Sequence, residues 1–193
     1  FNDRGIAYGL KGEPDRAITA LQKVLSFPYE GPLGGGQVPL TPALLRLDPM
    51  FDPLYQELNR RKAVVYTHPK EADCCLNVVP GIGSATIEYG TNTTRTIGSL
   101  VFSGTTTKYP DITFIFSHAG GTMPFLIERF LGNTAAEIVP GVVTKGQGGS
   151  GRLGDNPQKV PKGVLYELRR MYYDTAQSSN MVAMRALRTV VPV

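Results

Sequence analysis

Two apolar segments, each ending in a histidine, constrain this chain more than any other feature. They read Arg61-Lys-Ala-Val-Val-Tyr-Thr-His-Pro69 and Asp111-Ile-Thr-Phe-Ile-Phe-Ser-His-Ala-Gly-Gly121, and they contain the only two histidines of the sequence. Runs rich in Val, Ile and Phe that close on Pro or Gly-Gly predict strands buried on both faces, as in parallel sheets. A histidine therefore stands where each predicted strand ends.

The segment between the two histidines predicts how the strands are related. Residues 84–107 form the longest helical pattern of the sequence, with apolar residues at intervals that suit one face of a helix. A strand, helix, strand crossover makes its two strands parallel. We therefore expect His68 and His118 at the same end of the sheet, where α/β proteins assemble their functional sites.

The same pattern of helix followed by short strand continues along the chain and indicates an α/β fold. Helices are expected at residues 52–62, 124–131, 164–171 and 180–190, and a third strand is expected at residues 172–176. That strand contains Asp174. From the residues alone, His68, His118 and Asp174 could bind a metal ion or serve as acid and base on one face of the molecule.

The turn after the second histidine strand has two interpretations. Gly120-Gly121-Thr122 precedes Pro124 at the start of an expected helix. Free backbone amides at a helix start favour an anion such as a carboxylate or phosphate. The alternative is that the glycines only permit a tight turn.

The first 50 residues differ in character from the remainder. Residues 1–27 predict a helical hairpin, and their pattern of Gly5, Tyr8, Gly12, Ala17 and Leu21 resembles a single tetratricopeptide repeat. Two ordinary helices of an α/β domain are the alternative. Residues 28–50 are rich in Gly and Pro and predict a linker, so residues 51–193 form the expected main domain.

Composition excludes several classes of function. The net charge is +4, but the basic residues are dispersed and form no stripe interleaved with aromatic residues, which argues against nucleic-acid binding. No apolar run approaches the roughly 20 residues that cross a bilayer, and no signal peptide is recognised. The only cysteines, Cys74 and Cys75, are adjacent and suit a reducing cytoplasm better than a disulfide framework.

Several motifs of the main domain resemble a known family. They are Glu57-Leu-Asn-Arg-Arg-Lys-Ala-Val-Val-Tyr-Thr-His-Pro69, Ser103-Gly-Thr, Tyr109-Pro-Asp-Ile, Phe116-Ser-His-Ala-Gly-Gly-Thr-Met-Pro124 and Tyr172-Tyr-Asp-Thr-Ala176. In this order they resemble the amidohydrolase-related metal-dependent decarboxylases, which include the aminocarboxymuconate-semialdehyde, methylsalicylate and resorcylate decarboxylases.

The resemblance implies a TIM-barrel-like (β/α)8 fold with one divalent metal ion, zinc in the first place and manganese in the second. By resemblance, His68 binds the metal and His118 acts as the catalytic acid and base. Arg129 matches an arginine that binds the substrate carboxylate, in some members that of a neighbouring subunit, which implies a homodimer. Asp174 matches a position that is structural or lines the substrate site.

The sequence also departs from the family pattern. It contains neither the His-x-His pair of the family's first strand nor the Gly-Thr-Asp turn of its last strand, so His68 is the only family metal ligand present. About three of eight barrel strands are expected. We therefore predict a partial, unclosed barrel with exposed strand edges, and a chain that by itself binds metal weakly and is incomplete as an enzyme.

Three functions follow as hypotheses. The first is a metal-dependent carboxy-lyase that decarboxylates a small aromatic or enoic carboxylate. The second is a hydrolase of a lactone or cyclic amide, because the same scaffold directs a metal-bound water at such substrates. The third is a helical interaction module or a non-catalytic fragment, which the repeat-like residues 1–27 motivate.

Overall fold

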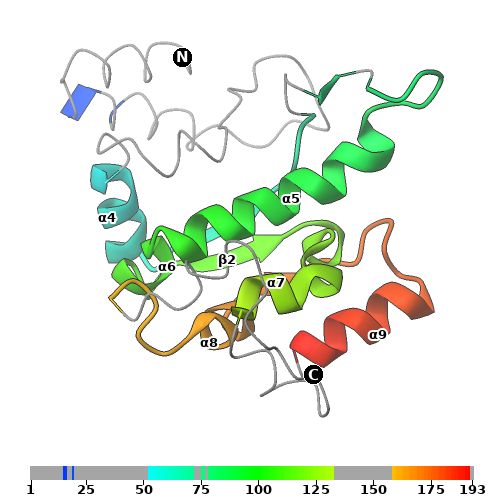
Figure 1. The fold of residues 1–193 in the computed structure, drawn as a ribbon. Helices are drawn as coiled ribbons and strands as arrows, with labels where there is room; N and C mark the ends of the chain where they lie inside the picture. Colours follow the sequence, from blue (N-terminus) through cyan, green and yellow to red (C-terminus); the bar gives the residue numbers. More distant parts are fainter. Residues whose placement is uncertain are drawn as a thin grey trace.

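The protein was analysed in a computed structural model that describes residues 52–71, 75–76, 78–132 and 158–191, together with Asp15, Arg16 and Thr19. This part of the chain is α/β, with three parallel strands in the order β1-β2-β3 (Figure 1). The α/β class and the parallel strands are confirmed. The hairpin predicted at 1–27 and the linker predicted at 28–50 lie outside the described residues, apart from the three residues just named.

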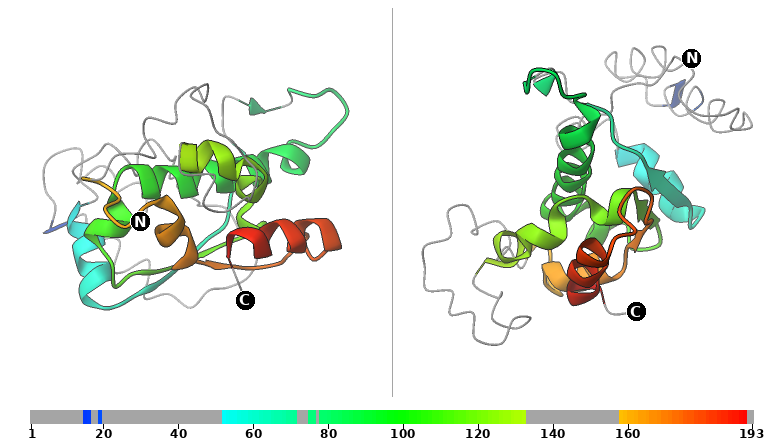
Figure 2. Two further views of the ribbon diagram at one scale, coloured as in Figure 1. Left: turned by 60° about the horizontal axis from the view of Figure 1, so that its bottom comes forward. Right: turned by 90° about the vertical axis from the view of Figure 1, so that its right-hand side faces the viewer.

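The helices alternate with the strands along the chain. Figure 2 shows helices α5, α7, α8 and α9 gathered around the sheet in two further views. The bounds of the elements, in chain order, are α4 (Asp52–Arg60), β1 (Val64–Thr67), α5 (Ala85–Phe102), α6 (Thr105–Lys108), β2 (Thr113–Phe116), η3 (His118–Gly120), η4 (Met123–Leu126), α7 (Ile127–Leu131), α8 (Val164–Arg169), β3 (Tyr172–Tyr173) and α9 (Met181–Val190).

The single helix predicted for residues 84–107 is in fact two helices. Helix α5 ends at Phe102, and α6 begins after Gly104. Gly104 adopts a left-handed conformation with φ of 82°, which stops a helix and which glycine adopts without steric cost. The crossover between β1 and β2 therefore contains a bend at its end.

The prediction that both histidine strands are buried on both faces is wrong for β1. In the parallel register, Val65, Phe114 and Tyr173 share the face that packs against the helices, where Phe114 is buried. On the opposite face Val64 is 65% exposed and Tyr66 52% exposed. The strand reads as uniformly apolar, but only one of its faces is covered in the described structure.

The apolar core lies between the sheet and its helices. Its fully buried apolar side chains come from α5, β2, η4, α8 and α9, which shows that these elements close around one centre. They are Ile97, Leu100, Val101, Phe116, Met123, Leu168 and Val190. Local hydrogen bonds cap the helix ends. At the start of α9, for example, the side chain of Asn180 accepts hydrogen bonds from Val182 N and Ala183 N.

No helix in the described ranges is long and apolar enough to span a membrane. Cys75 is partly buried and carries a free thiol, whereas Cys74 lies outside the described residues. The cytoplasmic location therefore stays a prediction.

Candidate functional site

The two histidines meet at the carboxyl ends of β1 and β2. Strand β1 ends at Thr67 and β2 ends at Phe116, so each histidine follows its strand by one or two residues. The centroids of the His68 and His118 rings are 5.2 Å apart, and the rings cross at 72°. The predicted convergence of the two imidazoles is confirmed, because parallel strands bring equivalent ends to the same edge.

A tyrosine completes this cluster and was not found by sequence reasoning. Tyr89, on the second turn of α5, meets His68 edge to face at 5.5 Å. It stacks on His118 at 6.1 Å with 18° between the ring planes. Its position near the start of the crossover helix was the available signal, because this helix begins above the strand end that carries His68.

Hydrogen bonds set the tautomers of both imidazoles. His68 Nδ1 lies 3.0 Å from the carbonyl oxygen of Pro69, and His118 Nδ1 lies 2.9 Å from that of Ala176. A carbonyl only accepts, so Nδ1 carries the proton and donates in each case, and the neutral ring keeps a lone pair on Nε2. His118 Nε2 is buried and has no hydrogen-bond partner among the described residues. It is thus an acceptor that lacks a donor.

Asp174 does not join the histidines as a third ligand. Its Oδ1 accepts from the backbone amides of His118 and Ala176, both at 2.9 Å, and its Oδ2 accepts from the Tyr66 hydroxyl at 2.6 Å. Burial acts to raise the pKa of Asp174, but these hydrogen bonds outweigh it and hold the pKa below its ordinary value. The carboxylate therefore acts as a structural acceptor in this protein.

The Gly-Gly turn after β2 is not an anion site. Gly120 N donates to Ser117 O and Gly121 N donates to His118 O. Thr122 N donates to Thr94 Oγ1 at 2.8 Å. With these amides occupied, the tight-turn interpretation holds and the anion interpretation is wrong. The turn instead fastens the His118 segment to α5.

Arg129 lies apart from the imidazole cluster. It is on α7 and its side chain is exposed. The assignment of Arg129 to a substrate carboxylate stays a prediction, and an exposed position on a helix suits an arginine that acts across a subunit boundary.

The residues present fit only part of a metal site. His68 supplies an Nε2 lone pair, which is the donor type that zinc and other divalent ions accept. The ring of His118 lies 5.2 Å away, measured between the ring centroids. The carboxylate of Asp174 is already used by three hydrogen-bond donors. No group of three or more His, Cys, Asp or Glu side chains that could hold a metal occurs within the described ranges.

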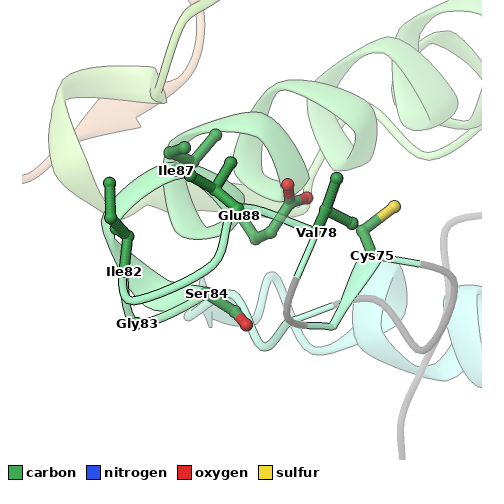
Figure 3. Close-up of a pocket in the computed structure, with 8 residues that line it drawn as sticks. Cys75, Val78, Ile82, Gly83, Ser84, Ile87 and Glu88 are labelled. Atoms are coloured by element: carbon green, nitrogen blue, oxygen red, sulfur yellow. The ribbon is translucent and has the colours of Figure 1, made fainter.

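A small surface pocket lies near the start of α5 and is separate from the histidines. Figure 3 shows it between Cys75 and Val78 on one side and Ile82, Ile87 and Glu88 on the other. Its lining is mainly aliphatic. Neither imidazole contributes to it, so it carries none of the acid and base groups described above.

No family model matches the sequence. A decarboxylase of Aspergillus niger, yanB, is 35% identical over 142 residues, which are 71% of this chain and 34% of that protein. The 6-methylsalicylic acid decarboxylase of Penicillium expansum is 33% identical over 137 residues, which are 71% of this chain and 37% of that protein. In sequence, this chain is similar to fungal decarboxylases.

One solved structure is similar to this chain in its fold. The crystal structure of 5-carboxyvanillate decarboxylase from Sphingomonas paucimobilis matches 93% of this chain and 50% of that chain, with a TM-score of 0.59 and 17% identity. The chain spans about a third of the length of the curated decarboxylases it matches.

Proposed function

We propose that this chain forms a carboxyl-side part of the (β/α)8 barrel of a non-oxidative decarboxylase that acts on an aromatic carboxylate of the hydroxybenzoate type. The names of the related fungal proteins and the open parallel sheet with histidines at its strand ends support this proposal. The uncovered sheet face at Val64 and Tyr66 is what an unclosed barrel would present on its inner side.

The observation that carries the proposal is the state of His118. Its ring is fixed through Nδ1, and its buried Nε2 has no donor among the described residues. Such an imidazole can take up a proton at Nε2 and deliver it from there. Decarboxylation of an aromatic acid needs this proton, because the ring carbon that loses carbon dioxide must be protonated as its bond to the carboxylate breaks.

The other site residues have supporting roles in this proposal. His68 would hold a divalent ion, zinc or manganese, and this ion would supply Lewis-acid stabilisation of negative charge on the substrate. Arg129 would bind the substrate carboxylate of a neighbouring subunit in a homodimer. Tyr89 stacks on His118 and can limit the approach of an aromatic substrate to one side of the imidazoles.

The reaction class can be tested on the natural protein that carries this sequence. It is incubated with carboxyl-¹³C 6-methylsalicylate and related hydroxybenzoates, and separately with a panel of lactones. Release of labelled carbon dioxide without lactone opening is the expected result. Lactone opening without release of carbon dioxide would replace the lyase proposal with the hydrolase alternative.

A further inference from the structure

The segment that carries His118 has an unusual backbone. His118 and Ala119 both have positive φ angles, of 57° and 55°. Residues with a Cβ adopt this left-handed region rarely, because the Cβ then lies too close to the backbone carbonyl oxygen. Two such residues in succession persist only where surrounding contacts hold them.

The contacts that hold this turn converge on one residue, Asp174. Its carboxylate Oδ1 accepts from His118 N at 2.9 Å, and its backbone carbonyl accepts from Ala119 N at 2.7 Å. Both strained residues are therefore bound to Asp174. The backbone of Asp174 is itself fixed, because its amide donates to Phe116 O at 2.9 Å and extends the pairing of β3 with β2.

The same carboxylate also places the group that fixes the His118 ring. Asp174 Oδ1 accepts from Ala176 N at 2.9 Å, and this bond closes a short turn after β3. That turn brings the carbonyl of Ala176 to His118 Nδ1. One oxygen atom thus connects the backbone of His118 with the residue that sets its tautomer.

A third donor to the carboxylate keeps it in this orientation. The hydroxyl of Tyr66 reaches from β1 to Asp174 Oδ2 at 2.6 Å, across 108 positions in the sequence. With Oδ2 bound to β1, Oδ1 is directed at the two amides. Three donors thus use most of the roughly four acceptor sites of the Asp174 carboxylate.

We propose that Asp174 is the positioning residue of His118. Asp174 holds the strained turn and, through Ala176, keeps the imidazole of His118 in the Nδ1-protonated form, with Nε2 open for proton transfer. This inference deepens the proposed function and rests on it for its catalytic meaning. The part of the proposal that concerns the tautomer of the His118 ring can be measured without an activity assay.

The test is the tautomer of His118 by long-range ¹H–¹⁵N NMR on the full chain, at a pH at which the imidazole is neutral. In the native chain we expect two widely separated ring ¹⁵N shifts with the proton on Nδ1. In Asp174→Ala we expect the two shifts to move toward each other, because the ring exchanges between both tautomers. Unchanged shifts in a folded Asp174→Ala chain would overturn the proposal.

Two further variants keep the test decisive if Asp174→Ala does not fold. Asp174→Asn keeps an oxygen in place but weakens it as an acceptor, so the amide protons of His118 and Ala176 should move upfield. Unchanged amide shifts in Asp174→Asn would contradict the proposal. Asp111→Asn is the matched control, since Asp111 lies before β2 beside Asn59, and it should leave both readouts as they are.

If the tautomer responds as expected but the natural protein releases no carbon dioxide, the positioning role stands and the decarboxylase proposal fails. If carbon dioxide is released but the tautomer does not respond to the Asp174 variants, the decarboxylase proposal stands and the positioning role of Asp174 fails. The two proposals are therefore separable.

Discussion

Gly121 shows how closely the site residues depend on one another. A Cβ at this position would lie 2.1 Å from the carbonyl oxygen of Gly90 on α5, and its φ of 66° is left-handed. The close approach joins the His118 turn to the helix that carries Tyr89. The geometry of the imidazole cluster therefore requires a residue without a side chain at position 121.

We expect Gly121→Ala to lower the free energy of unfolding by about 3 kcal/mol or to prevent folding, because the left-handed φ and the collision with Gly90 act together. The matched control is Gly81→Ala. Gly81 has a similar φ of 78° but no atom within 4 Å of its Cβ position. Its cost should stay near 1–2 kcal/mol, from φ alone. Chemical denaturation measures both, and equal losses would show that the approach to Gly90 is unimportant.

At the level of residues, the sequence predicted where the site residues lie better than it predicted what each of them does. His68 and His118 converge as expected, because strand ends in a parallel sheet meet at one edge. The role of Asp174 could not be predicted from the residues alone, because its partners are backbone amides, one of them 56 positions away. The family resemblance, which implied that Asp174 is structural or lines the substrate site, came closer to the role that the structure shows.

At the level of elements, the start of α4 is held to the end of α6 by a polar cluster. Asp52 accepts hydrogen bonds from the side chains of Lys108 and Tyr109. The Lys108 bond is the largest cause that lowers the pKa of Asp52 below its ordinary value of 3.8. The cluster joins residues more than 50 positions apart and so contributes to the tertiary fold.

This cluster gives a stability difference with a definite sign. Because the pKa of Asp52 is lower in the folded chain, its contribution is fully present above the ordinary pKa of 3.8 and is lost as the pH falls through the folded value. Asp52→Asn should therefore lower Tm slightly at pH 6, and the difference from the native chain should shrink below pH ~3.5. The groups are largely exposed, so an effect below about 1 kcal/mol is expected.

Thermal unfolding at several pH values measures this dependence. Asp111→Asn serves again as a control, because Asp111 is an exposed carboxylate without a lysine partner in the described structure. A difference for Asp52→Asn that grows as the pH falls would contradict the argument.

Element boundaries were predicted well only where local chemistry fixes them. The expected start of the closing helix at residue 180 matches because the side chain of Asn180 caps α9. The break of the crossover helix at Gly104 was missed, since periodicity continued across a single glycine. The third strand was expected at residues 172–176, but β3 covers only Tyr172–Tyr173, because the carboxylate of Asp174 then turns toward His118.

At the level of the whole molecule, one face of the sheet is covered and the other is uncovered in the part of the chain that the structure describes. Val65 packs against the core, whereas its neighbour Val64 is 65% exposed. The sequence could not show this difference, because both residues are valine and lie in one apolar run. The uncovered face follows from the open sheet, which no further strand pairs or covers within the described ranges.

These two valines test the open sheet directly. Val65→Thr should lower the free energy of unfolding by about 1–2 kcal/mol, because it places a hydroxyl against the apolar core. Val64→Thr should change it by less than about 0.5 kcal/mol. Equal losses in chemical denaturation would mean that the face with Val64 is covered in solution.

The helical interaction module of the third hypothesis lies outside the described residues and stays a prediction.

His118 is proposed as the proton donor of a decarboxylase site, and the variant His118→Gln of the natural protein tests this role. The measurement is the rate of ¹³CO₂ release from carboxyl-labelled 6-methylsalicylate, with Arg185→Gln on the exposed side of α9 as the control variant. We expect His118→Gln to lose roughly 10²-fold or more of the rate, as removal of a general acid does, and the control to keep it. A rate for His118→Gln equal to that of the native protein would show that His118 is not the proton donor.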